Sequence, residues 1–131
     1  MLNSAATEGL RGLLQWSDPV IFDRLRDAYR ERVSDFGTVL KLARLHARVW
    51  RALIEGDMER FEEQRAALVE ALDEQGLTLD CLAEADARTM EELVEIVVSR
   101  FQRSQRLATG YHLALIGLAE RLAPRHLIKA A

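Results

Sequence analysis

Histidine is the side chain in this sequence with the widest chemical repertoire, and it occurs at His46, His112 and His126. An imidazole can move protons near neutral pH or bind a metal or haem iron. No two of the three are spaced as ligands on one helical turn, and no HExxH motif is present. A single histidine on an apolar helix is typical of a hydrogen-bonded core residue, which is our interpretation of His46. A haem or metal ligand at His46 or His112 is the alternative.

Carboxylates occur as adjacent pairs, such as Glu62-Glu63 and Glu91-Glu92. Neighbouring residues of a helix point in different directions, so these pairs do not converge on one substrate. Glu92 and Glu95 share a helical face, but no histidine joins them as in the Glu-x-x-His motif of di-iron bundles. The GxSxG, Walker and GxGxxG motifs are also absent. The sequence therefore predicts no metal site and no enzyme, with a lipid-acting helical enzyme as a further alternative.

The composition is that of one helical domain. The chain has 131 residues, of which 49% are hydrophobic, 30% charged and only 6% aromatic, a mixture that favours helix. The net charge is -3, and arginines alternate with acidic residues, as in ERFEEQR, which argues against nucleic-acid binding. The single cysteine, Cys81, excludes an intramolecular disulfide, and we interpret it as a small buried hydrophobe.

The chain shows no sequence signal for a membrane or for secretion. Its first residues lack a basic segment followed by an apolar run. The longest apolar run, residues 113–119, is far too short to cross a bilayer. We therefore expect a cytoplasmic protein without a membrane partner.

Capping signals divide the first half of the sequence into four predicted helices. Ser17 and Asp18 precede Pro19, an arrangement typical of a helix start, and Gly37 is the predicted left-handed stop of that helix. The third helix is apolar on a wide arc, so we expect it at the centre of the fold. The predicted helices span residues 4–16, 19–36, 38–55 and 58–74, and the second is expected to bury Phe22, Leu25, Tyr29, Val33 and Phe36.

One long helix is predicted in the C-terminal half. Residues 78–86 read as a short helical or irregular stretch, after which Thr89 and Glu92 form a capping box. The helix continues from there to about Ala123, with a kink near Gly110 as an option. Its apolar residues follow a heptad pattern longer than packing in one small domain requires, so we expect a homodimer. The predicted dimer interface comprises Val97, Phe101, Ala108, Tyr111, Leu115, Leu118 and Leu122.

The sequence as a whole predicts an all-α fold. It reads as a single domain of five or six helices, either globin-like or a helical bundle, with a long C-terminal helix. Within it, residues 1–18 form a short helix and turn, residues 19–123 the helical core, and residues 124–131 a tail. No segment shows the alternation of a half-buried strand.

Two stretches resemble the sensor globin, or protoglobin-like, domain of bacterial globin-coupled sensors. IFDRLRDAYRERVSDF resembles an early helix of that family, and HARVWRALIEGDMERFEEQRAAL is the closer match. The second stretch contains Trp50, Gly56, Asp57 and Phe61 in the order that the family tends to show. The Gly-Leu at residues 76–77 resembles the turn that follows the family's haem-bearing helix.

This resemblance covers roughly residues 20–118, and it departs from the family at the haem. Leu72 occupies the position of the proximal histidine, and Cys81 and Leu82 occupy that of an aromatic pair. Because leucine cannot coordinate iron, the resemblance implies a haem-free sensor domain whose pocket is filled by side chains or holds an apolar ligand. Such domains often precede transducer, kinase or cyclase modules, which implies a downstream signalling partner. The pocket is expected to involve His46, Trp50, Leu72 and Tyr111.

Two functions therefore follow as hypotheses. The first is a haem-free, globin-like regulatory sensor domain that acts in signal transduction, dimerises through its C-terminal helix and has no cofactor. The second is a small helical adaptor or secretion chaperone, in which the apolar stripe binds a partner helix. A plain helical bundle would share the helical periodicity of the sensor globins without their function.

Overall fold

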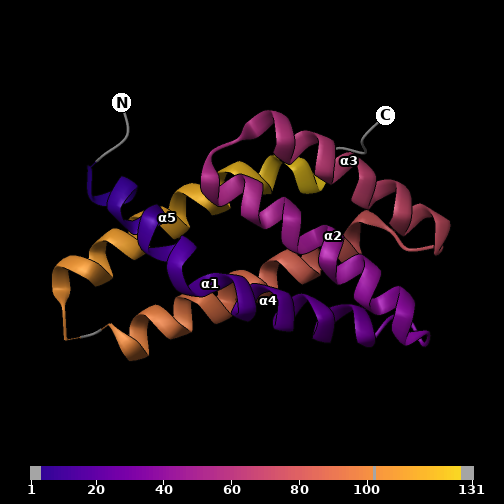
Figure 1. Ribbon diagram of the computed structural model, residues 1–131, viewed down its shortest axis with the longest axis horizontal. Coiled ribbons are helices and arrows are strands. Elements are labelled where there is room, and N and C mark those ends of the chain that lie inside the picture. The colour runs from indigo at the N-terminus through magenta and orange to yellow at the C-terminus, as the bar shows by residue number, and fades with distance from the viewer. Residues whose placement is uncertain (1–3, 102, 128–131) are drawn as a thin grey trace.

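The computed structural model describes residues 4–101 and 103–127, and these form five α-helices and one short 3-10 helix without any strand (Figure 1). The all-α prediction, with five or six helices, is confirmed. None of the described helices is long and apolar enough to span a membrane. The elements are α1 Ser4–Arg30, α2 Phe36–Glu55, α3 Met58–Glu74, α4 Leu79–Arg100, α5 Gln105–Leu122 and η1 Ala123–Leu127.

Helix α1 is continuous where the sequence predicted two helices, and Pro19 lies inside it. Proline lacks the N–H that its helical turn needs, and Figure 1 shows that the two halves of α1 run in different directions. Leu13, Ser17, Ile21 and Leu25 follow one another every four residues and are all buried. The buried face therefore runs through the proline, and packing holds the two halves together as one bent helix.

The end of α1 and the start of α2 also differ from the prediction. Helix α1 ends at Arg30, and α2 begins at Phe36 because Asp35 caps it by accepting from the backbone N–H of Thr38 at 3.0 Å. Phe36, predicted in the core, is 55% exposed because it lies in the first turn of α2 beyond the packed face. Gly37 is not left-handed, since a helix already runs through it.

The hairpin of α2 and α3 agrees with the predicted boundaries. Gly56 ends α2 with φ +79°, and its N–H donates to carbonyls of the last turn. Asp57 then caps α3 by accepting from the backbone N–H of Arg60 at 3.1 Å. Helix α2 is buried along most of its length, including the fully buried Trp50, as its apolar composition predicted.

The helix predicted from Thr89 to Ala123 is divided in two. Helix α4 begins earlier, so Thr89 lies inside it and its hydroxyl donates to the carbonyl of Ala85 at 2.9 Å instead of capping a new helix. The chain turns after α4, and Ser104 caps α5. The turn allows both α4 and α5 to pack on α1. The heptad pattern therefore serves packing within the chain.

The N-terminal half of α1 crosses α5 closely, at glycines. A Cβ atom added to Gly9 would lie 2.6 Å from the carbonyl carbon of Gly110, far inside van der Waals contact. A Cβ atom on Gly12 would similarly lie 2.6 Å from Cε1 of Tyr111. Glycine is thus required where these two helices touch. This crossing connects the two ends of the fold.

Candidate functional site

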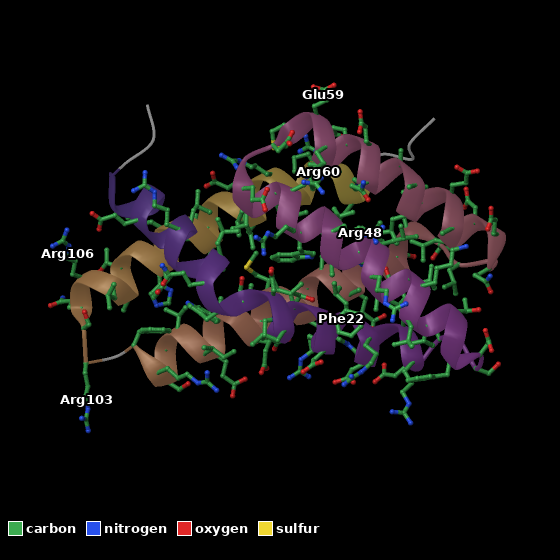
Figure 2. All side chains as sticks on the ribbon, in the orientation of Figure 1. Phe22, Arg48, Glu59, Arg60, Arg103 and Arg106 are labelled. Atoms are coloured by element: carbon green, nitrogen blue, oxygen red, sulfur yellow. The ribbon has the colours of Figure 1, made fainter. Side chains whose placement is uncertain are left out.

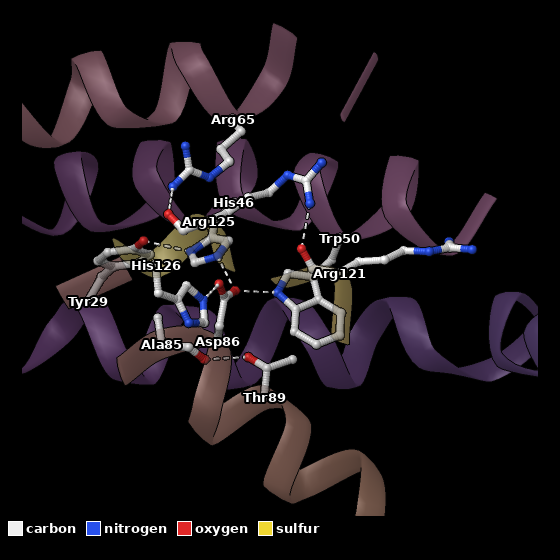
Figure 3. Close-up of polar contacts among 10 residues, drawn as sticks. All are labelled: Tyr29, His46, Trp50, Arg65, Ala85, Asp86, Thr89, Arg121, Arg125 and His126. Atoms are coloured by element: carbon white, nitrogen blue, oxygen red, sulfur yellow. Dashed lines mark hydrogen bonds and ion pairs between the residues drawn. The ribbon is translucent and has the colours of Figure 1, made fainter. Parts of the chain in front are cut away.

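The carboxylate of Asp86 on α4 lies in the core and contacts three side chains (Figure 3). Nε2 of His46 lies 2.6 Å from Oδ1, and Nε1 of Trp50 donates to the same oxygen at 2.8 Å. Nε2 of His126 lies 2.8 Å from Oδ2. A buried charge is costly unless it is paired and hydrogen-bonded, and here both carboxylate oxygens are satisfied.

The helices place these groups through simple periodicity. His46 and Trp50 lie one turn apart on α2, so both rings point from the same face towards α4. Asp86 lies on the buried face of α4 together with Leu82 and Leu93. His126 reaches the carboxylate from η1, at the C-terminal end of the described chain.

Tyr29 of α1 extends the network on the far side of His46, with 2.6 Å between its hydroxyl and Nδ1. The order hydroxyl, imidazole, carboxylate is that of a catalytic triad. Tyr29 is only 1% exposed, however, so a substrate cannot reach its oxygen. Burial, and then the negative charge of Asp86, raise the pKa of the Tyr29 hydroxyl well above its ordinary value. The arrangement is therefore suited to hydrogen bonding between helices and not to nucleophilic catalysis.

The electrostatics of Asp86 are set by opposing effects. Burial alone would raise the pKa of its carboxyl group. The positive charge of His46 and the hydrogen bonds from His126, His46 and Trp50 outweigh burial, and the pKa falls to about 2. The carboxylate is consequently ionised at neutral pH, and its charge holds the donors of α2 and η1 around it.

A second set of contacts anchors η1 to α3. The buried guanidinium of Arg65 donates to the carbonyl of Arg125, and burial lowers the pKa of Arg65. Nε of Arg125 donates to Glu62 at 2.7 Å, and its guanidinium lies 5.0 Å from the centre of the Phe61 ring. The C-terminal segment is therefore held by His126 on one side and by Arg125 on the other.

An apolar groove adjoins the network between α4, α5 and η1. It has a volume of about 200 Å³, somewhat more than a cavity of about 150 Å³ that accommodates benzene. His126, whose side chain is 23% exposed, belongs both to this groove and to the Asp86 network. The groove is lined by Asp86, Ala87, Met90, Ala119, Leu122, Ala123 and His126.

The four predicted pocket residues do not share one pocket. His46 and Trp50 meet at Asp86, whereas Leu72 lines a separate cavity of about 270 Å³ between α3 and the start of α4. Tyr111 packs against Phe101, with 4.6 Å between ring centres, and against Trp16 at 5.7 Å. The bend of α1 brings Trp16 to α5, a contact that the sequence could not reveal.

Sequence reasoning missed Tyr29, Asp86 and His126 as members of the site. Asp86 could have been found, because it falls on the helical face of Leu82 and Leu93 and is therefore an acidic residue in an apolar stripe. His126 gave no such signal, since it lies in the segment interpreted as a tail. Cys81 is buried, as predicted. Within residues 4–101 and 103–127, no cluster of three or more His, Cys, Asp or Glu side chains is arranged to hold a metal ion.

Most of the predicted dimer interface faces the interior of the chain itself. Phe101 and Ala108 are half-buried at the turn between α4 and α5. The large apolar side chains that are exposed on these helices are instead Val98, Leu107 and Ile116. The buried residues of the predicted interface are Val97, Tyr111, Leu115, Leu118 and Leu122.

Comparisons of the chain with protein-family models, curated proteins and solved structures find no match. The resemblance to sensor globins accordingly rests on the sequence stretches given above.

Proposed function

We propose that this chain is a haem-free, globin-like regulatory domain that binds a small apolar ligand in the groove between α4, α5 and η1. One observation carries the proposal, namely that His126 is shared by the groove and by the Asp86 network. A ligand that displaces the imidazole changes the hydrogen bonding of Asp86. His46 and Tyr29 then respond, because they are bonded to Asp86 in sequence.

The C-terminal segment is the element that would transmit such a signal. Docked η1 is bonded to α4 by His126 and to α3 by Arg125. A ligand shifts the balance between docked and undocked η1 by its difference in affinity for the two states. The proposed output is this change in docking, presented to a downstream signalling partner, and no catalysed reaction is involved.

Native mass spectrometry of the purified protein, titrated with toluene, phenol and hexanol, tests the ligand proposal. We expect one molecule of at least one probe to bind each chain. Ala119→Phe places a large side chain in the groove and should abolish this binding. Ala67→Phe, at another exposed alanine on α3, should not. Equal binding by both variants would contradict the proposal. A Soret band after incubation with haem would overturn the haem-free assignment.

We further propose that the domain forms a homodimer through the outward face of α5. Ile116 is 55% exposed at the middle of this helix, and Leu113 lies half-buried beside it on the same outward side. Light scattering coupled to size-exclusion chromatography should report a dimer that Ile116→Glu dissociates and Val98→Glu does not. A monomeric wild-type protein at high concentration would rule this proposal out.

A helical adaptor is the second candidate function, and a surface between α1 and α2, described below, favours it. An adaptor would return one stoichiometric protein partner and no small-molecule adduct by native mass spectrometry. A ligand-binding domain would show the adduct.

A further inference from the structure

The exposed side of α2 is uniformly basic over three turns. Its exposed positions between residues 41 and 51 are Lys41, Arg44, Arg48 and Arg51, and α2 contains no acidic residue before Glu55. Spacings of three and four residues place the four cations in one row, about 15 Å long at 1.5 Å per residue. We call this row the α2 ridge. Its sign is opposite to the net charge of the chain, which is -3.

The α2 ridge is largely unneutralised. Arg51 pairs with Asp18 of α1 and with Glu55. No ion pair or side-chain hydrogen bond joins Lys41, Arg44 or Arg48 to any residue in the part of the chain that the structure describes. Like charges one turn apart on a helix repel each other, so the ridge gains free energy from an external anion.

An apolar groove lies between α1 and α2, beside the Arg48 and Arg51 end of the ridge. It has a volume of about 360 Å³, and Ile21, Phe22 and Ala47 form its apolar lining. Arg48 and Arg51 form its basic edge, and Asp18 lies at one end. Figure 2 labels Phe22 and Arg48 on the two facing helices. Two antiparallel helices with an apolar groove between them form a surface on which a third helix can pack.

We infer that this groove docks an acidic amphipathic helix of a partner protein. The apolar side chains of the partner would enter between α1 and α2, beside Phe22. Its carboxylates, repeating every three or four residues, would pair with Lys41, Arg44 and Arg48. This surface is separate from the groove at His126, so the inference goes beyond the proposed ligand-binding function and does not depend on it.

The chemistry of the groove favours a protein helix over other anionic partners. A nucleic acid would meet an apolar lining, the carboxylates of Asp18 and Glu55 at the edge, and a chain of net negative charge. An anionic membrane would require several exposed apolar side chains for insertion. Along α2 the only large exposed one is Phe36, at the far end of the helix from the groove.

Fluorescence anisotropy with a labelled helical peptide tests the inference. The probe has three heptads, with leucine at positions a and d and glutamate at the flanking positions. We expect saturable binding that weakens with added salt. The double variant Arg44→Glu and Arg48→Glu should weaken binding by about tenfold or more, and Phe22→Ala should weaken it with little change in salt dependence.

A matched control is available at the turn between α4 and α5. The double variant Arg103→Glu and Arg106→Glu makes the same charge change there, far from the ridge (Figure 2), and should bind the peptide as the wild type does. Ala119→Phe should also leave peptide binding unchanged, which separates this result from the ligand proposal. Circular dichroism spectra of each variant serve to check that it is folded.

Three outcomes would overturn the inference. The first is no binding of the peptide by the wild type. The second is equal binding by wild type and the Arg44→Glu, Arg48→Glu variant. The third is ridge-dependent binding to duplex DNA or to phosphatidylserine vesicles that is tighter than binding to the peptide, which would assign the ridge to a nucleic acid or a membrane instead.

Discussion

Replacement of Asp86 by asparagine removes one negative charge from the core and preserves the shape of the side chain. The amide oxygen can take the place of Oδ1 and still contact Nε1 of Trp50 and Nε2 of His46. The amide nitrogen then takes the place of Oδ2, so Nε2 of His126 no longer faces an acceptor. His46 and His126 also lose the anion that attracts them. We expect Asp86→Asn to lower the free energy of unfolding by about 2–4 kcal/mol at neutral pH.

The size of this effect follows in part from the pKa of the carboxyl group. Its pKa falls from the ordinary value of 3.8 to about 2 in the folded protein. At 1.36 kcal/mol for each pKa unit, this difference corresponds to roughly 2 kcal/mol of stability. Because the folded pKa is the lower one, the contribution is fully present above pH 3.8. It is lost as the pH falls towards about 2.

Urea denaturation followed by circular dichroism measures the free energy of unfolding and its dependence on pH. The stability difference between wild type and Asp86→Asn should be full above about pH 4 and should shrink towards about pH 2. Glu92→Gln, a half-buried acid on the same helix paired with Arg24 at 2.7 Å, is the control and should cost less than about 1 kcal/mol. A pH-independent difference, or a loss no larger than that of the control, would refute the reasoning.

Three further substitutions test the packing and the network by the same denaturation assay. Gly9→Ala should destabilise the fold by about 1–3 kcal/mol, because its Cβ atom would collide with the backbone of Gly110. Gly117 also lies inside a helix, α5, but a Cβ atom added there has no atom within 4 Å, so Gly117→Ala should stabilise the fold by about 0.5–1 kcal/mol. Equal effects at the two glycines would contradict the close crossing of α1 and α5. Tyr29→Phe should cost about 1 kcal/mol by leaving Nδ1 of His46 without its partner, and a neutral result would argue against that hydrogen bond.

The sequence predicts the helices well where local chemistry decides their ends. Gly56 and Asp57 impose a stop and a cap whatever the rest of the chain does, and the α2–α3 hairpin agrees with that prediction. The prediction is wrong at Pro19 and at Thr89, where both residues lie inside helices. At these positions the buried faces of α1 and α4 continue past Pro19 and Thr89. Tertiary packing therefore outweighs the local preference of these two residues to begin a helix.

The candidate site was predictable only in part, because it is made by four separate segments. The apolar context of His46 indicated a buried, hydrogen-bonded histidine, and the structure gives it two partners. These partners, Tyr29 and Asp86, lie on other helices. His126, which shares Asp86 with it, lies 80 residues away on η1. Residues in one helix can be matched by periodicity, whereas contacts between helices require the fold itself.

The glycine crossing of α1 and α5 also has a consequence for biosynthesis. The N-terminal half of α1 leaves the ribosome about a hundred residues before the α5 residues that it packs against, such as Gly110. At about 5–20 residues per second, Leu13 and its neighbours are without their partner for on the order of 5–20 s. The crossing forms only after α5 has been made, so we expect this apolar face to be open to chaperones during translation.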